Sequence, residues 1–122
     1  MGYYSEHQPT CTVDVMGTKY DVYLNVDRKD DSCLEHCSGY CDKTVKRIVI
    51  EGPADDIEFA DFEVYAKTNL RHELVHAFLF ESGLDANSYW GSDGSDHSEQ
   101  MVEWVALQFP KLLKAFKQVN AL

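Results

Sequence analysis

Residues 71–84, RHELVHAFLFESGL, decide the architecture of this chain. Through this stretch and the residues before it, apolar side chains return at steps of three and four residues, which is the period of an amphipathic helix. These apolar positions are Phe59, Phe62, Ala66, Leu70, Leu74, Ala77 and Leu84. The period predicts one long helix that begins near Asp56 or Asp61 and ends at Gly83, because glycine adopts the left-handed conformation that follows many helices.

Ahead of this helix the sequence has the alternating apolar pattern of β-strands. Thr10–Val15 and Lys19–Val26 are predicted to form a hairpin through a turn at residues 16–18. Thr44–Glu51 is predicted to form a third strand, because it is rich in β-branched residues and is followed by Gly and Pro. Residues 27–43 are rich in Asp, Ser, Gly and Cys, and we predict a loop there.

After the long helix, residues 85–97 have the composition of a loop. A second helix is predicted over Ser98–Gln108, and Pro110 is expected to break it and to open a short third helix. We therefore predict a single α+β domain over residues 1–122. In this domain a small three-stranded, mostly antiparallel sheet packs on the long helix, the second helix and the short C-terminal helix.

The charge of the chain excludes several classes of partner. Lys and Arg together number 11 and Asp and Glu 21, so the net charge is -10. A chain this acidic lacks the basic face with which proteins bind nucleic acids or anionic membranes, so neither is expected as a partner. No apolar stretch approaches the roughly 20 residues of a membrane helix, and residues 1–8 lack the pattern of a signal peptide, so we expect a cytoplasmic protein.

The long helix contains the sequence H-E-x-x-H, formed by His72, Glu73 and His76. Residues four positions apart lie about one helical turn apart, so both imidazoles project from one face of the helix and can bind the same metal ion. Glu73 follows the first histidine and lies beside the metal, where it takes a proton from a metal-activated water. The motif therefore predicts one bound Zn²⁺ and a glutamate general base.

A catalytic zinc site also needs a third protein ligand. The second predicted helix offers Glu99 as this ligand and Glu103, one turn later, as the residue that orients a liganding histidine. The reverse assignment stays open, because Glu99 would be occupied by a capping box if Asp96 caps that helix. His97 is a further alternative ligand.

Residues 71–84 and the segment from Glu99 to Ala106 together resemble the gluzincin class of zinc metallopeptidases. The chain looks most like the compact single-domain members, often called minigluzincins, and similar small H-E-x-x-H proteins of phages and Firmicutes. The resemblance covers residues 70–110, about a third of the chain. It implies a zincin-like fold in which His72 and His76 bind zinc, Glu73 is the base, Glu99 is the third ligand and Glu103 supports a histidine.

The resemblance also implies how a substrate lies. In such peptidases the edge strand of the sheet pairs with an extended peptide, and Lys46–Glu51 would be that edge. Larger gluzincins stabilise the oxyanion with a Tyr or His from a second domain, and we expect no room for such a domain in these 122 residues. The candidates for that role here are Tyr40, Tyr89, Trp90 and His97.

The four cysteines leave several interpretations open. Cys33, Cys37 and Cys41 follow one another at four-residue intervals with His36 among them, which is not the tight pair of most structural zinc sites. Free thiols are the favoured interpretation. A structural zinc site, a disulfide that involves Cys11, and a thiol latch in which Cys41 lies near the metal are the alternatives.

We expect from these features a zinc-dependent hydrolase that cleaves a peptide bond in a peptide or protein substrate. One alternative is a non-catalytic zinc-binding accessory or regulatory protein that serves an unidentified protein partner. The other is a latent peptidase in which the lysine-rich segment after Pro110 covers the cleft, although packing of that segment on the core is favoured.

Overall fold

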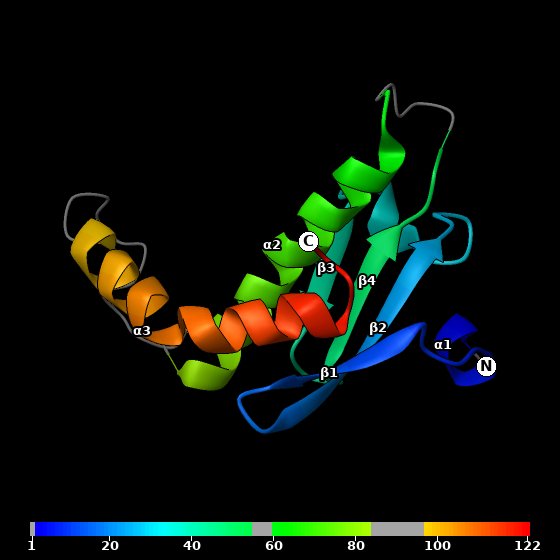
Figure 1. Cartoon of the computed structure of the whole chain (residues 1–122). Helices are drawn as coiled ribbons and strands as arrows, with labels where there is room; N and C mark the ends of the chain where they lie inside the picture. Colours follow the sequence, from blue (N-terminus) through cyan, green and yellow to red (C-terminus); the bar gives the residue numbers. More distant parts are fainter. Residues whose placement is uncertain (1, 55–59, 84–96) are drawn as a thin grey trace.

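The computed structural model describes residues 2–54, 60–83 and 97–122, and at residues 97–103 and 106 it describes the helix without the side chains. The elements along the chain are α1 (Tyr3–Glu6), β1 (Cys11–Val15), β2 (Thr18–Val26), the 3₁₀ helix η1 (Ser32–Glu35), β3 (Gly39–Asp42), β4 (Arg47–Glu51), α2 (Phe62–Ser82) and α3 (His97–Gln118) (Figure 1). The α+β class is confirmed. Among the described residues, no helix combines the length and the apolar composition needed to cross a bilayer.

The four strands form one mixed sheet in the order β1-β2-β4-β3. β1 and β2 are antiparallel and are joined at Met16 and Gly17, which both have positive φ, as a tight two-residue hairpin turn requires. β2 and β4 are parallel, whereas β3 and β4 are antiparallel. The predicted hairpin and the strand before Gly52 are confirmed, but the prediction of three strands is wrong because β3 adds a fourth.

β3 is the edge strand beside α2, so the prediction that Lys46–Glu51 forms this edge is also wrong. β4, which comes from that segment, lies between β2 and β3 in the sheet. β3 begins with Gly39 and ends with Asp42, and both residue types have low strand propensity. Pairing with the buried strand β4 imposes the extended conformation, and this long-range cause is invisible in the local sequence of residues 27–43.

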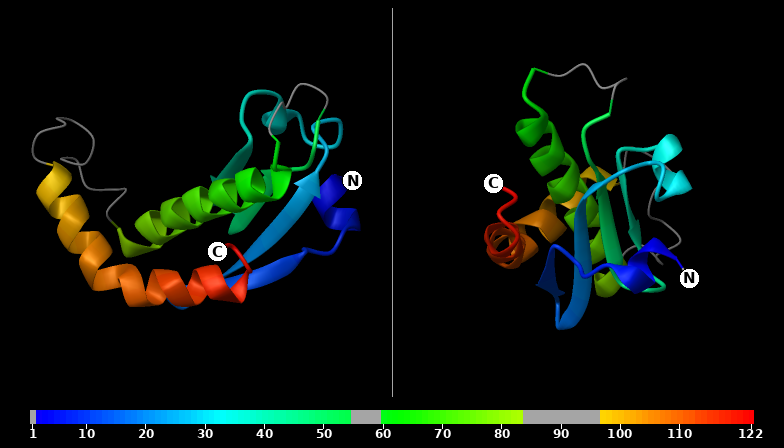
Figure 2. Two further views of the ribbon diagram at one scale, coloured as in Figure 1. Left: turned by 45° about the horizontal axis from the view of Figure 1, so that its top comes forward. Right: turned by 90° about the vertical axis from the view of Figure 1, so that its right-hand side faces the viewer.

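The sheet separates two apolar clusters. Ile48 and Ile50 of β4 pack toward α2 and α3, whereas Val49 between them packs on the opposite face. This alternation follows the two-residue period of a strand, so β4 is buried on both faces. In side view, α2 and α3 cover one face of the sheet while α1 and η1 lie on the other (Figure 2). The cluster around Val49 also contains Tyr23, Val26 and Leu34, with Tyr3, Tyr4 and Tyr40 packed against it.

α2 begins and ends as its sequence predicts. The Asp61 side chain accepts a hydrogen bond from Val64 N and caps the first turn. Gly83 follows the last turn in the left-handed conformation, with φ +84°. Of the two predicted starts, Asp61 is therefore the cap, and Asp56 lies outside the described residues.

α3 is one continuous helix with Pro110 inside it, so the prediction of two helices separated at Pro110 is wrong. An internal proline removes one backbone hydrogen bond and bends a helix, but tertiary packing can hold both halves in place. Trp104 before the proline and Leu112 and Ala115 after it are all buried in the core. The ribbon of α3 bends near its middle (Figure 1). The segment after Pro110 packs on the core, as the sequence analysis favoured.

Glu81 connects the last turns of α2 to the sheet. One carboxylate oxygen accepts a hydrogen bond from Thr18 Oγ1 at 2.9 Å, and the other accepts from Tyr20 OH at 2.6 Å and Lys46 Nζ at 2.9 Å. The hydrogen bond from Tyr20 is the main cause that lowers the pKa of Glu81. Burial opposes this effect, and Lys46 and Thr18 add to it. The carboxylate therefore stabilises the folded state in its charged form.

We predict that Glu81→Gln lowers the free energy of unfolding at pH 7 by about 2 kcal/mol, because charge-assisted hydrogen bonds are lost. The lowered pKa means that this contribution is complete above the unfolded-state pKa of about 4.3 and disappears as the pH falls through the lower folded-state value. Urea unfolding from pH 7 downward should therefore show the wild type and the variant converging in acid.

Glu63→Gln on the same helix is the matched control. Its side chain is 77% exposed and pairs only with Lys67 among the described residues. We expect its free energy of unfolding to stay within about 0.5 kcal/mol of the wild type at every pH. Equal effects of the two substitutions would contradict the role assigned to Glu81.

Candidate metal centre

His72 and His76 converge on one face of α2. Their Nε2 atoms lie 3.1 Å apart, and their ring centroids lie 4.8 Å apart. Two nitrogens that bind one tetrahedral zinc at about 2.0–2.1 Å stand about 3.3 Å from each other. Both side chains are exposed, and the two nitrogens are within hydrogen-bond distance of each other. The histidine pair thus fits a zinc ion.

Glu73 lies between the histidines in sequence but points toward the sheet. It is 9% exposed, whereas both histidines are exposed. Burial raises the pKa of Glu73, and the nearby His76 and His72 oppose this effect. The helix therefore carries two exposed imidazoles, and between them in sequence a buried glutamate whose pKa is raised.

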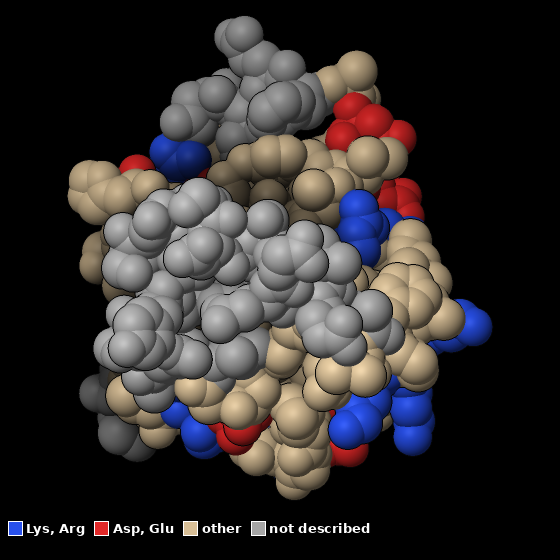
Figure 3. All heavy atoms as spheres, turned by 90° about the vertical axis from the view of Figure 1, so that its left-hand side faces the viewer, with Lys and Arg blue, Asp and Glu red and all other residues tan. Residues whose placement is uncertain are grey.

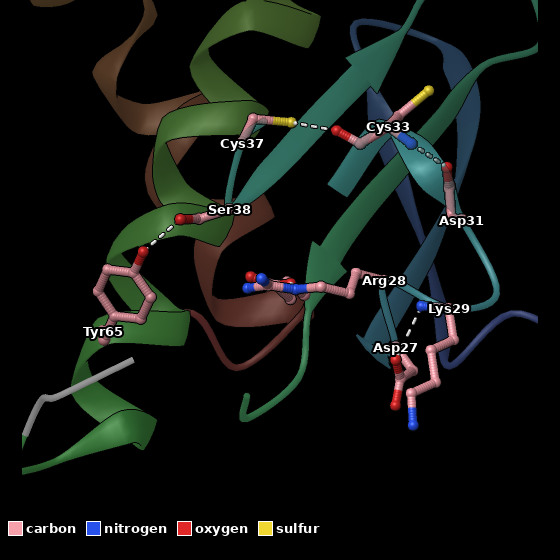
Figure 4. Close-up of polar contacts among 9 residues, drawn as sticks. Asp27, Arg28, Lys29, Asp31, Cys33, Cys37, Ser38 and Tyr65 are labelled. Carbon is pink, nitrogen blue, oxygen red and sulfur yellow. Dashed lines mark hydrogen bonds and ion pairs between the residues drawn. The ribbon is translucent and has the colours of Figure 1, made fainter. Parts of the chain in front are cut away.

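The close approach of β3 to α2 encloses Glu73. A Cβ atom on Gly39 would lie 2.8 Å from Ile50 Cδ1, 2.9 Å from Val49 O and 3.6 Å from Glu73 Cγ. Only a residue without a side chain fits at this point. One residue earlier, Ser38 Oγ is hydrogen-bonded to Tyr65 OH of α2, and the two side chains point toward one another (Figure 4). Sequence analysis missed these contacts, because the only local indication was a glycine in a presumed loop.

The outer side of β3 carries backbone groups that do not pair with β4, of which the Gly39 N–H donates a hydrogen bond to the sulfur of Cys37. Glu51 N–H donates to Ser38 O at 3.0 Å, and hydrogen-bonded and non-hydrogen-bonded pairs alternate along an antiparallel ladder. The register of β3 on β4 places Gly39 and Cys41 in the intervening pairs. The N–H and C=O groups of Gly39 and Cys41 therefore point away from β4. No further strand pairs with β3 in the described part of the chain.

The cysteines are free thiols and do not complete the centre within the described residues. Cys37 Sγ donates to Cys33 O at 3.2 Å, which turns its thiol toward η1 (Figure 4). Burial raises the pKa of Cys41 to about 12, and Glu73 is the next cause. Cys41 is thus a neutral thiol near the Glu73 carboxylate. Cys11 is one of these free thiols, so the structure does not support a disulfide that involves it.

Tyr40, one of the candidates for stabilising an oxyanion, lies on the wrong face of the sheet. Its side chain packs in the cluster of Val49, and its hydroxyl is hydrogen-bonded to Asp31. Strand alternation explains this orientation, because Gly39 and Cys41 on either side of Tyr40 take the positions that face α2. The candidates Tyr89 and Trp90 lie outside the described residues.

The structure does not describe the side chains of the predicted third ligand and of its alternatives. Glu99, Glu103 and His97 all belong to α3, and α3 packs on α2. Among the described side chains, no three of His, Cys, Asp and Glu gather closely enough to hold a metal ion. On the face near the start of α3, described acidic and basic side chains are interspersed (Figure 3). The described residues of this face therefore form no acidic patch.

Comparison with known proteins adds no family to this geometry. No family model matches the chain, and neither a curated protein nor a solved structure matches it. The interpretation of the centre therefore depends on the residues and contacts described above.

We predict that Gly39→Ala lowers the free energy of unfolding by about 2 kcal/mol, because a methyl group there must push β3 away from Val49 and Ile50 of β4. Gly2→Ala is the control, since a Cβ on Gly2 meets no atom within 4 Å, and it should change stability by less than about 0.5 kcal/mol. Chemical denaturation of both variants measures the difference. A Gly39→Ala protein as stable as the wild type would show that β3 and β4 are not in close contact at Gly39.

Proposed function

We propose that this chain is a zincin-like metallopeptidase that hydrolyses peptide bonds with one bound zinc ion. The observation that carries the proposal is the pair of exposed imidazole nitrogens 3.1 Å apart, with the buried Glu73 one residue from His72. Two exposed histidines that face each other add little to the stability of the fold, so metal binding explains their arrangement better than folding does. The resemblance of residues 71–84 to gluzincins supports the same function.

In this proposal His72 and His76 hold the zinc, Glu99 is the third ligand and Glu103 orients a liganding histidine. Zinc supplies a Lewis acid that polarises the scissile carbonyl and lowers the pKa of the attacking water. Glu73 accepts the proton of that water and passes it to the leaving amine. Burial suits Glu73 to this task, because a raised pKa lets a carboxylate hold a proton during the reaction.

The substrate in this proposal is an extended peptide that pairs with β3. The outward C=O group of Gly39 and the outward N–H and C=O groups of Cys41 provide the hydrogen bonds. Gly39 also packs over Glu73, so a peptide on this edge passes close to the base. In this proposal the strand that pairs with the peptide is therefore β3, whereas the family resemblance implied Lys46–Glu51.

The second candidate is a non-catalytic zinc-binding accessory or regulatory protein. It is favoured by the orientation of Tyr40, which faces away from Glu73 and so offers an oxyanion no hydrogen bond. In such a protein the zinc would hold α2 and α3 together and a surface would serve a protein partner. Retained zinc without any hydrolysis by the wild type would favour this candidate.

We predict that the wild type binds one zinc per chain and that His76→Ala loses it, because a single imidazole leaves the ion too few ligands. Elemental analysis of the purified proteins measures the content. His36→Ala is the matched control and should keep the zinc. Zinc retained by His76→Ala but lost from His36→Ala would move the site to the cysteine cluster and contradict the proposal.

Glu73→Gln should keep the zinc and lower the rate of hydrolysis by about 10³-fold, because the amide cannot accept a proton. A library of internally quenched peptides reports the rate. Glu63→Gln, an exposed substitution on the same helix, should leave the rate unchanged. Full activity of Glu73→Gln would rule out the proposed base.

A further inference from the structure

A hollow lies between the turn of the β1-β2 hairpin and the second half of α3 (Figure 1). Its volume is about 450 Å³, which is within the usual size range of ligand pockets. Met16 of the turn and Phe78 of α2 line it, together with Lys111, Lys114 and Ala115 of α3. The hollow is therefore built from three elements of the described fold.

The base of the hollow is apolar. Phe78 and Ala115 are buried at its base, whereas Met16 beside them is 38% exposed. The unbranched thioether side chain of a methionine adapts to partners of irregular shape. Leu107 lies one helical turn before Lys111 on α3 and is 66% exposed. Exposed apolar side chains beside an apolar base form a surface that burial against a partner would stabilise.

The charge around the hollow differs in sign from the charge of the whole chain. All 21 Asp and Glu residues precede Trp104, whereas three lysines follow it. Two of these, Lys111 and Lys114, are exposed and form no ion pair with a described side chain. Asp14 also lines the hollow, and its carboxylate accepts a hydrogen bond from Gly17 N within the turn. The hollow is thus a basic site on an acidic protein.

The hollow and the candidate metal centre lie on different sides of α2. A helix turns by about 100° per residue, so Phe78 lies about 200° around α2 from His76. Phe78 is buried at the hollow, whereas His76 is exposed on the other side of the helix. A molecule bound in the hollow therefore leaves the two histidines accessible.

We propose that the hollow is a docking site for a protein partner, whose bound segment carries one large apolar side chain with Asp or Glu close beside it. The apolar side chain is buried against Met16 and Phe78, and the carboxylates pair with Lys111 and Lys114. A second copy of this chain is disfavoured as the occupant, because two chains of net charge -10 repel each other. The docking site goes beyond the proposed function and is compatible with both candidates for it.

Phage display of random peptides of about twelve residues on the zinc-loaded wild type tests the proposal. We expect the enriched peptides to carry Trp, Phe, Leu or Met with Asp or Glu within about two residues. Fluorescence anisotropy then measures the affinity of the most enriched peptide for purified variants. Lys114→Glu should weaken its binding about fivefold, because an attractive contact between exposed charges becomes repulsive.

Lys117→Glu is the matched control, since it makes the same charge change on the same helix at a residue that does not line the hollow. It should change the affinity by less than about twofold. Met16→Asn removes the apolar contact and suits the positive φ of this residue. We expect Met16→Asn to weaken binding about fivefold and to keep the circular dichroism spectrum of the wild type.

The inference is overturned if no peptide is enriched, if the enriched peptides lack acidic residues, or if Lys114→Glu and Lys117→Glu weaken binding equally. A peptide that loses affinity for His76→Ala but keeps it for Lys114→Glu binds at the metal centre, which also overturns the inference. Sedimentation equilibrium of the wild type alone tests the second copy. Self-association that Lys114→Glu abolishes would make another copy of this chain the occupant and overturn the proposal of a separate partner.

Discussion

The contact between β3 and α2 at Gly39 and Glu73 is the constraint on which the candidate centre depends. The absent side chain of Gly39 lets this edge strand pack tightly on β4, and the same residue lies against Glu73 of the helix that carries both histidines. Glu73 is buried there, and burial raises the pKa of its carboxyl group.

The features that depend on local sequence were predictable. The start of α2 at an aspartate cap and its end at Gly83 follow from short-range hydrogen bonding and backbone conformation. The convergence of His72 and His76 follows from their spacing on one helix. The hairpin of β1 and β2 follows from alternating residues around a tight turn. In each case the cause lies within a few residues of its effect.

The features that depend on distant contacts were not predictable. β3 is extended because β4 pairs with it, and Pro110 is tolerated because buried residues on both sides hold α3 in place. The hydrogen bond between Ser38 and Tyr65 joins residues far apart in the chain. These contacts determine which strand forms the edge, and therefore where a peptide would bind.

The identity of the metal ligands is the central claim, and X-ray absorption at the zinc edge tests it most directly. The spectrum of the zinc-loaded protein should show only nitrogen and oxygen neighbours at about 2.0–2.2 Å, with the outer scattering of two imidazole rings. Sulfur neighbours at about 2.3 Å would contradict the account, because they would place the zinc among Cys33, Cys37 and Cys41 instead of on α2.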